Sequence, residues 1–324
     1  MRTIRRLGYL ALLLGFAQIV FGAIVRITGS GMGCGDHWPD CYGSFTPGAE
    51  NGGQNLLVEI SHRYGAAALS LAIVALVVAA WLKRRDPGVS GRGGALRASL
   101  LAILLVIVAA LFGAVTVKMQ LNPVVVVTHL AIAMSLLAVL VVVVVRAGGL
   151  GAAAVGARAK RTFHSGRAAA GLTFVALVLG ALTANTPGAP LACQGFPWCR
   201  VIAEHGAPLL IQVTHRIIAF LLLGHLIGIS VGVRKRVEPW PIRDAAWAAL
   251  GIVVVQILVA AAMVEMHLPA SLRSLHQAVG TALWVAVVAL AALAGGPRGQ
   301  VGISEIERES PSRGEFATPE GVST

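Results

Sequence analysis

Residues 57–82 read LVEISHRYGAAALSLAIVALVVAAWL, and residues 208–233 read PLLIQVTHRIIAFLLLGHLIGISVGV. Each stretch exceeds the roughly 20 apolar residues that a helix needs to cross the hydrocarbon core of a bilayer. Each also carries a histidine followed by an arginine near its start, although ionisable side chains are costly in lipid and usually mark function. The two stretches therefore predict a membrane protein with functional histidines.

Working outward from these two stretches, six further segments are also long and apolar enough to span. The composition agrees, because 12% of the residues are charged, against about 25% in an ordinary soluble protein. The first apolar run is too long for the core of a signal peptide, so we interpret it as a retained helix. The expected spans are 7–27, 57–82, 97–119, 123–145, 168–186, 208–233, 243–266 and 270–294.

The basic charge of the chain follows the expected topology. The net charge is +12, and 20 of the 26 Lys and Arg residues lie at the two ends of the chain or in alternate connections between spans. The positive-inside rule places these segments on the cytoplasmic side. The charge pattern thus predicts two cytoplasmic termini and an even number of spans in the cell membrane, and it argues against a nucleic-acid partner.

The chain also repeats itself. Residues 60–63, Ile-Ser-His-Arg, are matched by residues 213–216, Val-Thr-His-Arg, and a proline precedes a histidine late in each half. Such repeats are typical of membrane proteins built from two similar units. We expect an all-α protein of two tandem, pseudo-symmetric four-helix bundles. The expected segments are an N-terminal unit at 1–146, a cytoplasmic linker at 147–166, a C-terminal unit at 167–295 and a disordered cytoplasmic tail at 296–324.

All four cysteines lie in the two long outer loops, at 28–56 and 187–207. The outer face of a cell membrane is oxidising, so we predict one disulfide in each loop, Cys34–Cys41 and Cys193–Cys199. Either a structural staple or a reducible redox pair fits this arrangement. The cysteine spacing matches no common zinc site.

Four of the nine histidines lie at matched places inside the spans, about five to seven residues from the outer end of an even-numbered helix. At 1.5 Å per residue, His62, His129, His215 and His276 are all roughly 8–11 Å deep. Two imidazoles at one depth on separate helices are typical of the two axial ligands of a haem iron. We predict one haem per half, and polar packing between helices is the alternative.

Four arginines lie close to these histidines in the sequence: Arg26, Arg63, Arg216 and Arg273. A haem carries two propionates, and guanidinium is the side chain that pairs best with a carboxylate. We therefore expect at least two of the four to contact propionates. The alternative is that they reach outward to lipid headgroups.

One position separates the two halves chemically. Glu59 stands three residues before His62, whereas Gln212 stands three residues before His215. This spacing places each side chain on the same helix face as its histidine. A carboxylate there could exchange protons or stabilise a developing positive charge, so we predict that Glu59 is catalytic. The alternative is a glutamate that is exposed to the outer loop.

At these residues the sequence resembles the haem A synthase (Cox15/CtaA) family. The resemblance covers nearly the whole chain apart from the tail, and His37, in the first outer loop, finds no role in it. The pieces that carry it are residues 25–31 (VRITGSG), Cys34, Cys41, residues 59–63 (EISHR), residues 128–129 (TH), residues 214–216 (THR) and His276.

The resemblance implies a substrate, a cofactor and a reaction. Haem O would be the substrate, held by His62 and His129 near Glu59, and haem b would be the cofactor, held by His215 and His276. The C8 methyl of haem O would undergo two successive hydroxylations, and loss of water would leave the formyl group of haem A. The implied partners are a haem O synthase upstream, terminal oxidase assembly downstream and an electron acceptor that the sequence does not identify.

Two other functions compete with this one. A dihaem b-type cytochrome that takes electrons from quinol explains the histidines, but not the difference between Glu59 and Gln212. A transporter built from parallel repeats explains the symmetry, but not the matched depths of the histidines. Gly- and Ala-rich spans are also compatible with close packing against a second copy of the chain.

Overall fold

The computed structural model describes residues 1–45, 53–91 and 93–296, so the expected tail lies outside the described residues apart from its first position. Eight described helices are long and apolar enough to cross a membrane, as the sequence predicted. The protein is therefore an all-α, multi-pass membrane protein. The long helices are α1 (Arg2–Ile27), α2 (Gly53–Leu82), α4 (Ala95–Lys118), α5 (Pro123–Arg146), α6 (Lys160–Asn185), α7 (Ala207–Lys235), α8 (Trp240–Glu265) and α9 (Ala270–Ala294).

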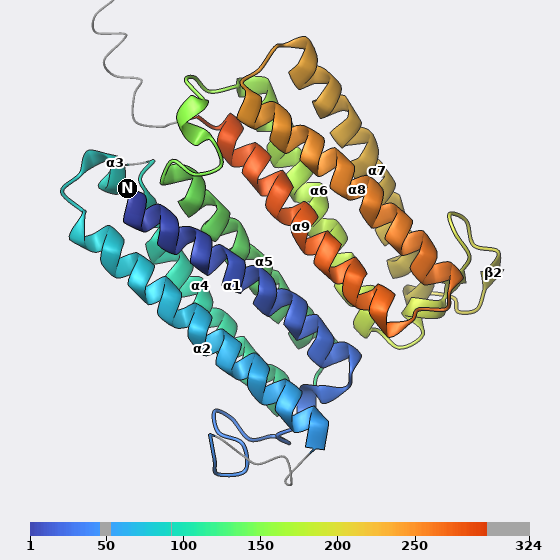
Figure 1. Cartoon of the computed structure of the whole chain (residues 1–324). Helices are drawn as coiled ribbons and strands as arrows, with labels where there is room; N and C mark the ends of the chain where they lie inside the picture. Colours follow the sequence, from blue (N-terminus) through green and yellow to red (C-terminus); the bar gives the residue numbers. More distant parts are fainter. Residues whose placement is uncertain (46–52, 92, 297–324) are drawn as a thin grey trace, which may run out of the picture.

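The long helices pack in two groups of four (Figure 1). In the first half α1, α2, α4 and α5 contact one another in a ring, and in the second half α6, α7, α8 and α9 do the same. Each half encloses its own apolar cluster, and a third cluster lies at the seam where α5 and α1 meet α9 and α6. At this seam the indole N–H of Trp284 donates to the carbonyl of Met134 at 2.8 Å.

Matching turns show the repeat in the backbone. Between α4 and α5, Gln120 and Leu121 adopt left-handed φ angles of 49° and 59°, and between α8 and α9, His267 and Leu268 adopt 61° and 64°. In both turns the two left-handed residues donate their N–H groups to carbonyls of the preceding helix in the same pattern. Non-glycine residues seldom adopt this conformation, so its appearance at both places shows that the two halves repeat the same turn.

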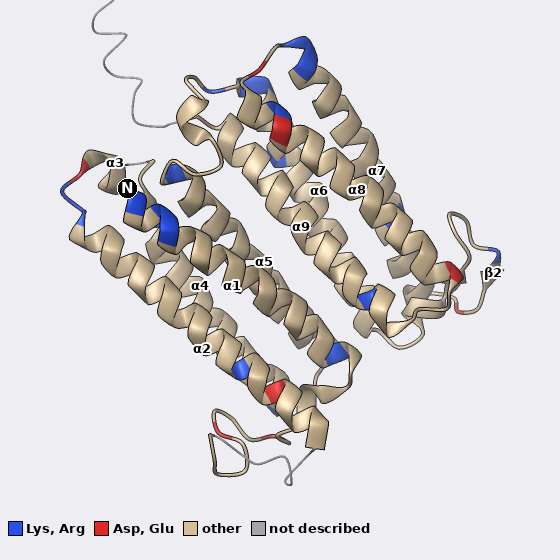
Figure 2. Ribbon diagram, viewed as in Figure 1, with Lys and Arg blue, Asp and Glu red and all other residues tan. Residues whose placement is uncertain are grey.

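The connections at the two ends of the bundle differ, because only one end carries the cysteine loops. The loops with the cysteines lie at the same end, away from the N-terminus, and Figure 2 shows charged residues gathered toward both ends. The short elements are η1 (Ser30–Met32), α3 (Pro87–Ser90), η3 (Ala152–Ala154), η4 (Ala189–Leu191) and the antiparallel strands β1 (Cys193–Gln194) and β2 (Val201–Ile202).

The helix bounds agree with the expected spans within a few residues, except at the start of α6. This helix begins at Lys160, whereas the expected span begins at 168. Hydropathy detects only the apolar part of a helix, and the first turns of α6 carry Lys160, Arg161 and Arg167. The helix therefore extends into the segment that the sequence predicted as linker.

Candidate functional site

The four histidines form two pairs, one within each half. His62 on α2 and His129 on α5 are close enough to interact electrostatically. The rings of His215 on α7 and His276 on α9 have centroids 6.5 Å apart. Metal–nitrogen bonds of about 2 Å on both sides of one ion put two imidazole centroids about 6 Å apart. The second pair therefore fits the axial ligands of a single haem iron.

Glycines allow the neighbouring helix to approach two of these rings. A methyl group at Gly22 on α1 would stand 3.0 Å from Cε1 of His62, and one at Gly180 on α6 would stand 3.0 Å from Cε1 of His215. This is tighter than an ordinary van der Waals contact between carbon atoms. The two glycines occupy corresponding places in the two halves. In each half the missing side chain leaves the space that the imidazole fills.

Two glutamines that no sequence motif singled out touch the predicted ligands. Nε2 of Gln18 lies 2.9 Å from Nδ1 of His62, and Nε2 of Gln256 lies 3.1 Å from Nδ1 of His276. A polar side chain inside an apolar span was the available signal. At His215 the main chain is the partner instead, because Nδ1 donates to the carbonyl of Ala176 at 2.9 Å. Nδ1 of His129 is buried without a hydrogen-bond partner among the described residues.

Glu59 and Gln212 occupy corresponding, buried positions and make corresponding bonds. Oε2 of Glu59 accepts the main-chain N–H of Cys34 at 2.9 Å, and Oε1 of Gln212 accepts that of Cys193 at 2.6 Å. Glu59 is only 4% exposed, so the alternative of a glutamate exposed to the outer loop is wrong. The glutamate also pairs with Arg63 at 2.5 Å, which balances its charge within the protein.

Arg63 and Arg216 hold the two cysteine loops. Besides Glu59, the guanidinium of Arg63 donates to the carbonyls of His37, Pro39 and Asp40. Arg216 donates in the same way to the carbonyls of Cys193, Gly195 and Pro197. Both guanidinium groups therefore bind loop carbonyls close to the histidines. His37 lies in the first loop, where its main-chain carbonyl accepts from Arg63.

Arg26 and Arg273 lie at the seam between the halves. Arg26 on α1 donates to the carbonyl of Ala184 on α6 at 3.3 Å and is close enough to Arg273 on α9 for mutual repulsion. Nε of Arg273 is buried and has no hydrogen-bond partner among the described residues. Two neighbouring cations of this kind favour an anionic ligand, since burying an unpaired charge is costly.

Disulfides close both cysteine loops at the expected cysteines. Cys34 is bonded to Cys41, and Cys193 is bonded to Cys199. The first disulfide is buried against Leu56 and Ile60, within one turn of Glu59 and His62. Each loop is thus tied to the start of a helix that carries a histidine.

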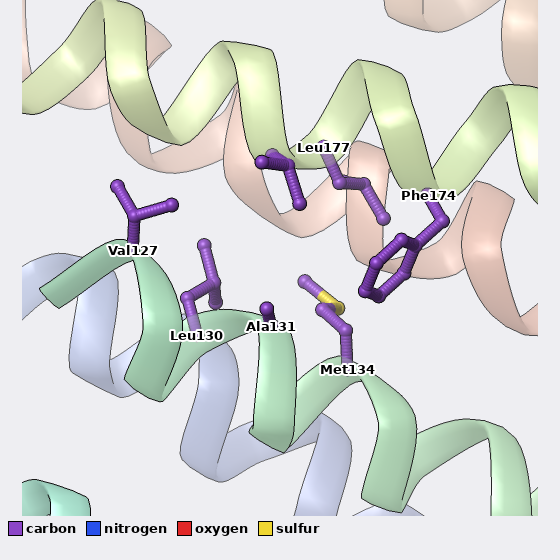
Figure 3. A pocket seen from close by; sticks show the side chains of 7 residues that line it. Val127, Leu130, Ala131, Met134, Phe174 and Leu177 are labelled. Carbon is purple, nitrogen blue, oxygen red and sulfur yellow. The ribbon is translucent and has the colours of Figure 1, made fainter. Parts of the chain in front are cut away.

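Figure 3 shows an apolar hollow between α5 and α6. It is lined by Val127, Leu130, Ala131, Met134, Phe174, Leu177 and Val178. Apart from the thioether of Met134 the lining is hydrocarbon, and it offers no group that could move a proton and no imidazole. The hollow lies at the seam between the halves, so the candidate site consists of the histidine pairs and not of this pocket.

Comparison with known proteins places the chain in a family. The sequence profile of the COX15-CtaA family, described as cytochrome oxidase assembly protein, matches residues 5–288. A heme A synthase of Bacillus pumilus is 29% identical over 234 residues, which cover 68% of this chain and 71% of that protein. A heme A synthase of Bacillus cereus is 25% identical over 318 residues, which cover 95% of this chain and 96% of that protein. The chain belongs to the COX15-CtaA family of cytochrome oxidase assembly proteins.

Proposed function

We propose that this protein is a haem A synthase, which converts the C8 methyl of haem O into the formyl group of haem A by two successive hydroxylations. The observation that carries the proposal is the combination of two internal histidine pairs with a family match over nearly the whole chain. The relatives at nearly full length are themselves named heme A synthase. This favours an enzyme over the dihaem b-type cytochrome.

We assign the resident cofactor, haem b, to the second half. His215 and His276 would be its axial ligands, and their ring separation of 6.5 Å supports this assignment. The hydrogen bond from Nδ1 of His215 to Ala176 leaves the other ring nitrogen free for iron. When bound, haem b supplies one-electron transfer.

The substrate, haem O, is assigned to the first half, between His62 and His129. This half contains Glu59, the only acidic side chain within hydrogen-bonding reach of Arg63 in the described part of the chain. The bond from Cys34 explains why an oxygen acceptor stands at this position, but Gln212 makes the same bond without a charge. The negative charge is therefore a feature of the first half alone. By giving up its bond to Arg63 or to Cys34, the carboxylate can take a proton from an attacking water or stabilise positive charge on the methyl carbon.

The propionates of the haems are assigned first to Arg26 and Arg273. Neither has a carboxylate partner among the described residues, and a propionate would relieve their mutual repulsion. Arg63 and Arg216 stand beside the same sites and reach the loop carbonyls instead. These bonds leave at least one of the five N–H groups of each guanidinium for a propionate.

The proposed setting is the cell membrane, with both termini in the cytoplasm and the two disulfide loops on the outer face. This orientation follows from the positive-inside rule and from the need of disulfides for an oxidising compartment. A haem O synthase would supply the substrate, and terminal oxidase assembly would receive the product. A second copy of the chain is a further proposed partner.

Extraction of haems from the purified, full-length protein tests the proposed function. An enzyme of this kind carries haem b together with a smaller amount of haem O or haem A, since substrate and product leave the site. A cytochrome would carry two permanent haem b groups, and a transporter would be colourless. Two equivalents of haem b, with no haem O or haem A in cells that make haem O, would contradict the proposal.

A further inference from the structure

Two glutamines lie across the rings of two predicted axial ligands. Nε2 of Gln18 on α1 lies 2.9 Å from Nδ1 and 3.3 Å from Nε2 of His62, and it donates to the main-chain carbonyl of His62 at 2.7 Å. Nε2 of Gln256 on α8 lies 3.1 Å from Nδ1 and 3.2 Å from Nε2 of His276. Nothing in the proposed chemistry requires either glutamine. Both are half-buried, but only Gln256 has an oxygen that is buried without a hydrogen-bond partner among the described residues, where a polar group needs one.

The positions of the two glutamines are exchanged between the halves. Gln18 stands four residues before Gly22, and the matching position before Gly180 is Ala176. Gln256 stands twenty residues before His276, and the matching position before His129 is Ala109. Each half therefore has one glutamine and one alanine facing its two histidines, but on opposite ligands.

Of the two alanines, Ala176 serves its histidine through the main chain. The carbonyl of Ala176 accepts from Nδ1 of His215 at 2.9 Å, whereas Nδ1 of His129 is buried without a hydrogen-bond partner among the described residues. A main-chain carbonyl is held by its helix and can only accept. Where glutamine stands, an amide replaces it, which can turn either its oxygen or its NH₂ group toward the ring.

The structure gives Gln256 a reason to turn. Its Oε1 is buried without a hydrogen-bond partner among the described residues, while its Nε2 faces the imidazole. An imidazole that ligates a metal through Nε2 has only Nδ1–H left, and this group needs an acceptor. Rotation of the amide by half a turn brings Oε1 to that place, because the two ends of the amide have the same shape.

We propose that Gln256 is a positioning residue that accepts Nδ1–H of His276 and so sets the donor strength of this imidazole toward haem iron. The inference rests on the proposed function, since it requires a haem between His215 and His276. An accepted Nδ1–H makes the imidazole more basic, which stabilises ferric iron and lowers the midpoint potential. In the second half one ligand is then held by main chain and the other is tuned by a side chain.

The experiment is a potentiometric titration of haem b in the purified, full-length protein. Gln256→Ala removes the acceptor and should raise the midpoint potential of haem b, whereas Gln256→Glu supplies a stronger acceptor and should lower it. Gln18→Ala should leave the haem b potential at the wild-type value, because Gln18 faces the other half. Val255→Ala, an exposed position next to Gln256 on α8, controls for a general effect of substitution on this helix.

Opposite shifts for the Ala and Glu variants support the assignment, because a loss of packing would not move the potential in two directions. If the Ala variant loses haem b, the Glu variant is the test. A lower midpoint potential of its haem b then supports the assignment, and an unchanged potential contradicts it. An unchanged potential in both variants, or loss of haem b from both, makes Gln256 a packing residue and overturns the inference. Wild-type protein without haem b would overturn the proposed function first, so the two failures are distinguishable.

Discussion

The carboxylate of Glu59 accepts the main-chain N–H of Cys34 at 2.9 Å and so joins helix α2, which carries His62, to the first disulfide loop. In the second half Gln212 makes the corresponding bond to Cys193. The two positions therefore share a structural role and differ in charge. A glutamine at position 59 separates these two contributions, because it keeps the acceptor and removes the carboxylate.

Glu59→Gln should leave the fold and both haem sites intact and abolish synthesis of haem A. Gln can still accept from Cys34, as Gln212 shows, but it can neither take a proton nor stabilise positive charge. Loss of one such catalytic group commonly costs about a hundredfold or more in rate. The measurement is chromatography of haems extracted from cells that express the variant, where haem O or a singly hydroxylated intermediate should accumulate.

The mirror substitution, Gln212→Glu, is the matched control and should leave haem A formation close to that of the wild type. Production of haem A by Glu59→Gln at the wild-type rate would show that the charge of Glu59 is not needed. The position would then serve only to anchor the loop.

Alanine in place of His215 or His276 should remove the low-spin b-type absorbance, because haem iron would lose one of its two axial imidazoles. His225→Ala is the control on the same helix, since Nε2 of His225 bonds the carbonyl of Ser165 at 2.9 Å and takes no part in the pair. Haem b content is measured on purified protein as the reduced pyridine complex. A full complement of haem b in both variants would refute the assignment.

Gly180→Ala should lower haem b occupancy severalfold, and Gly22→Ala should lower haem A production without changing haem b. In each case the added methyl group would stand 3.0 Å from the histidine ring and push it out of line. Gly171→Ala on α6 meets no atom within 4 Å and should behave as wild type. Equal haem b content in the Gly180 and Gly171 variants would show that the space beside His215 does not require a glycine at position 180.

Peptide mapping of the oxidised protein without reductant should find Cys34 linked to Cys41 and Cys193 linked to Cys199. Closing such short loops stabilises a protein by about 2–3 kcal/mol in the chain-entropy description. Replacing both cysteines of one loop by serine should therefore lower the thermal midpoint and leave the other loop closed. Peptides that join the first loop to the second would show a different pairing.

The sequence alone determined the number and approximate bounds of the spans, the internal repeat, the places of the four histidines along their helices and the cysteine pairs. These features depend only on residue type and on spacing along one chain. The start of α6 at Lys160 shows the limit of this reasoning, because a charged turn beyond the apolar run is still helical.

Only the tertiary structure decided which side chains meet across helices. Gln18 and His62 are on different helices, and so are Gln256 and His276; no periodicity within one helix reveals such a contact. Arg63 and Arg216 follow their histidines in sequence, yet their long side chains reach the carbonyls of the cysteine loops. The loop backbone is curved by its disulfide and presents oxygens that composition cannot locate, so the partners of these charges emerge only when the helices and loops are packed together.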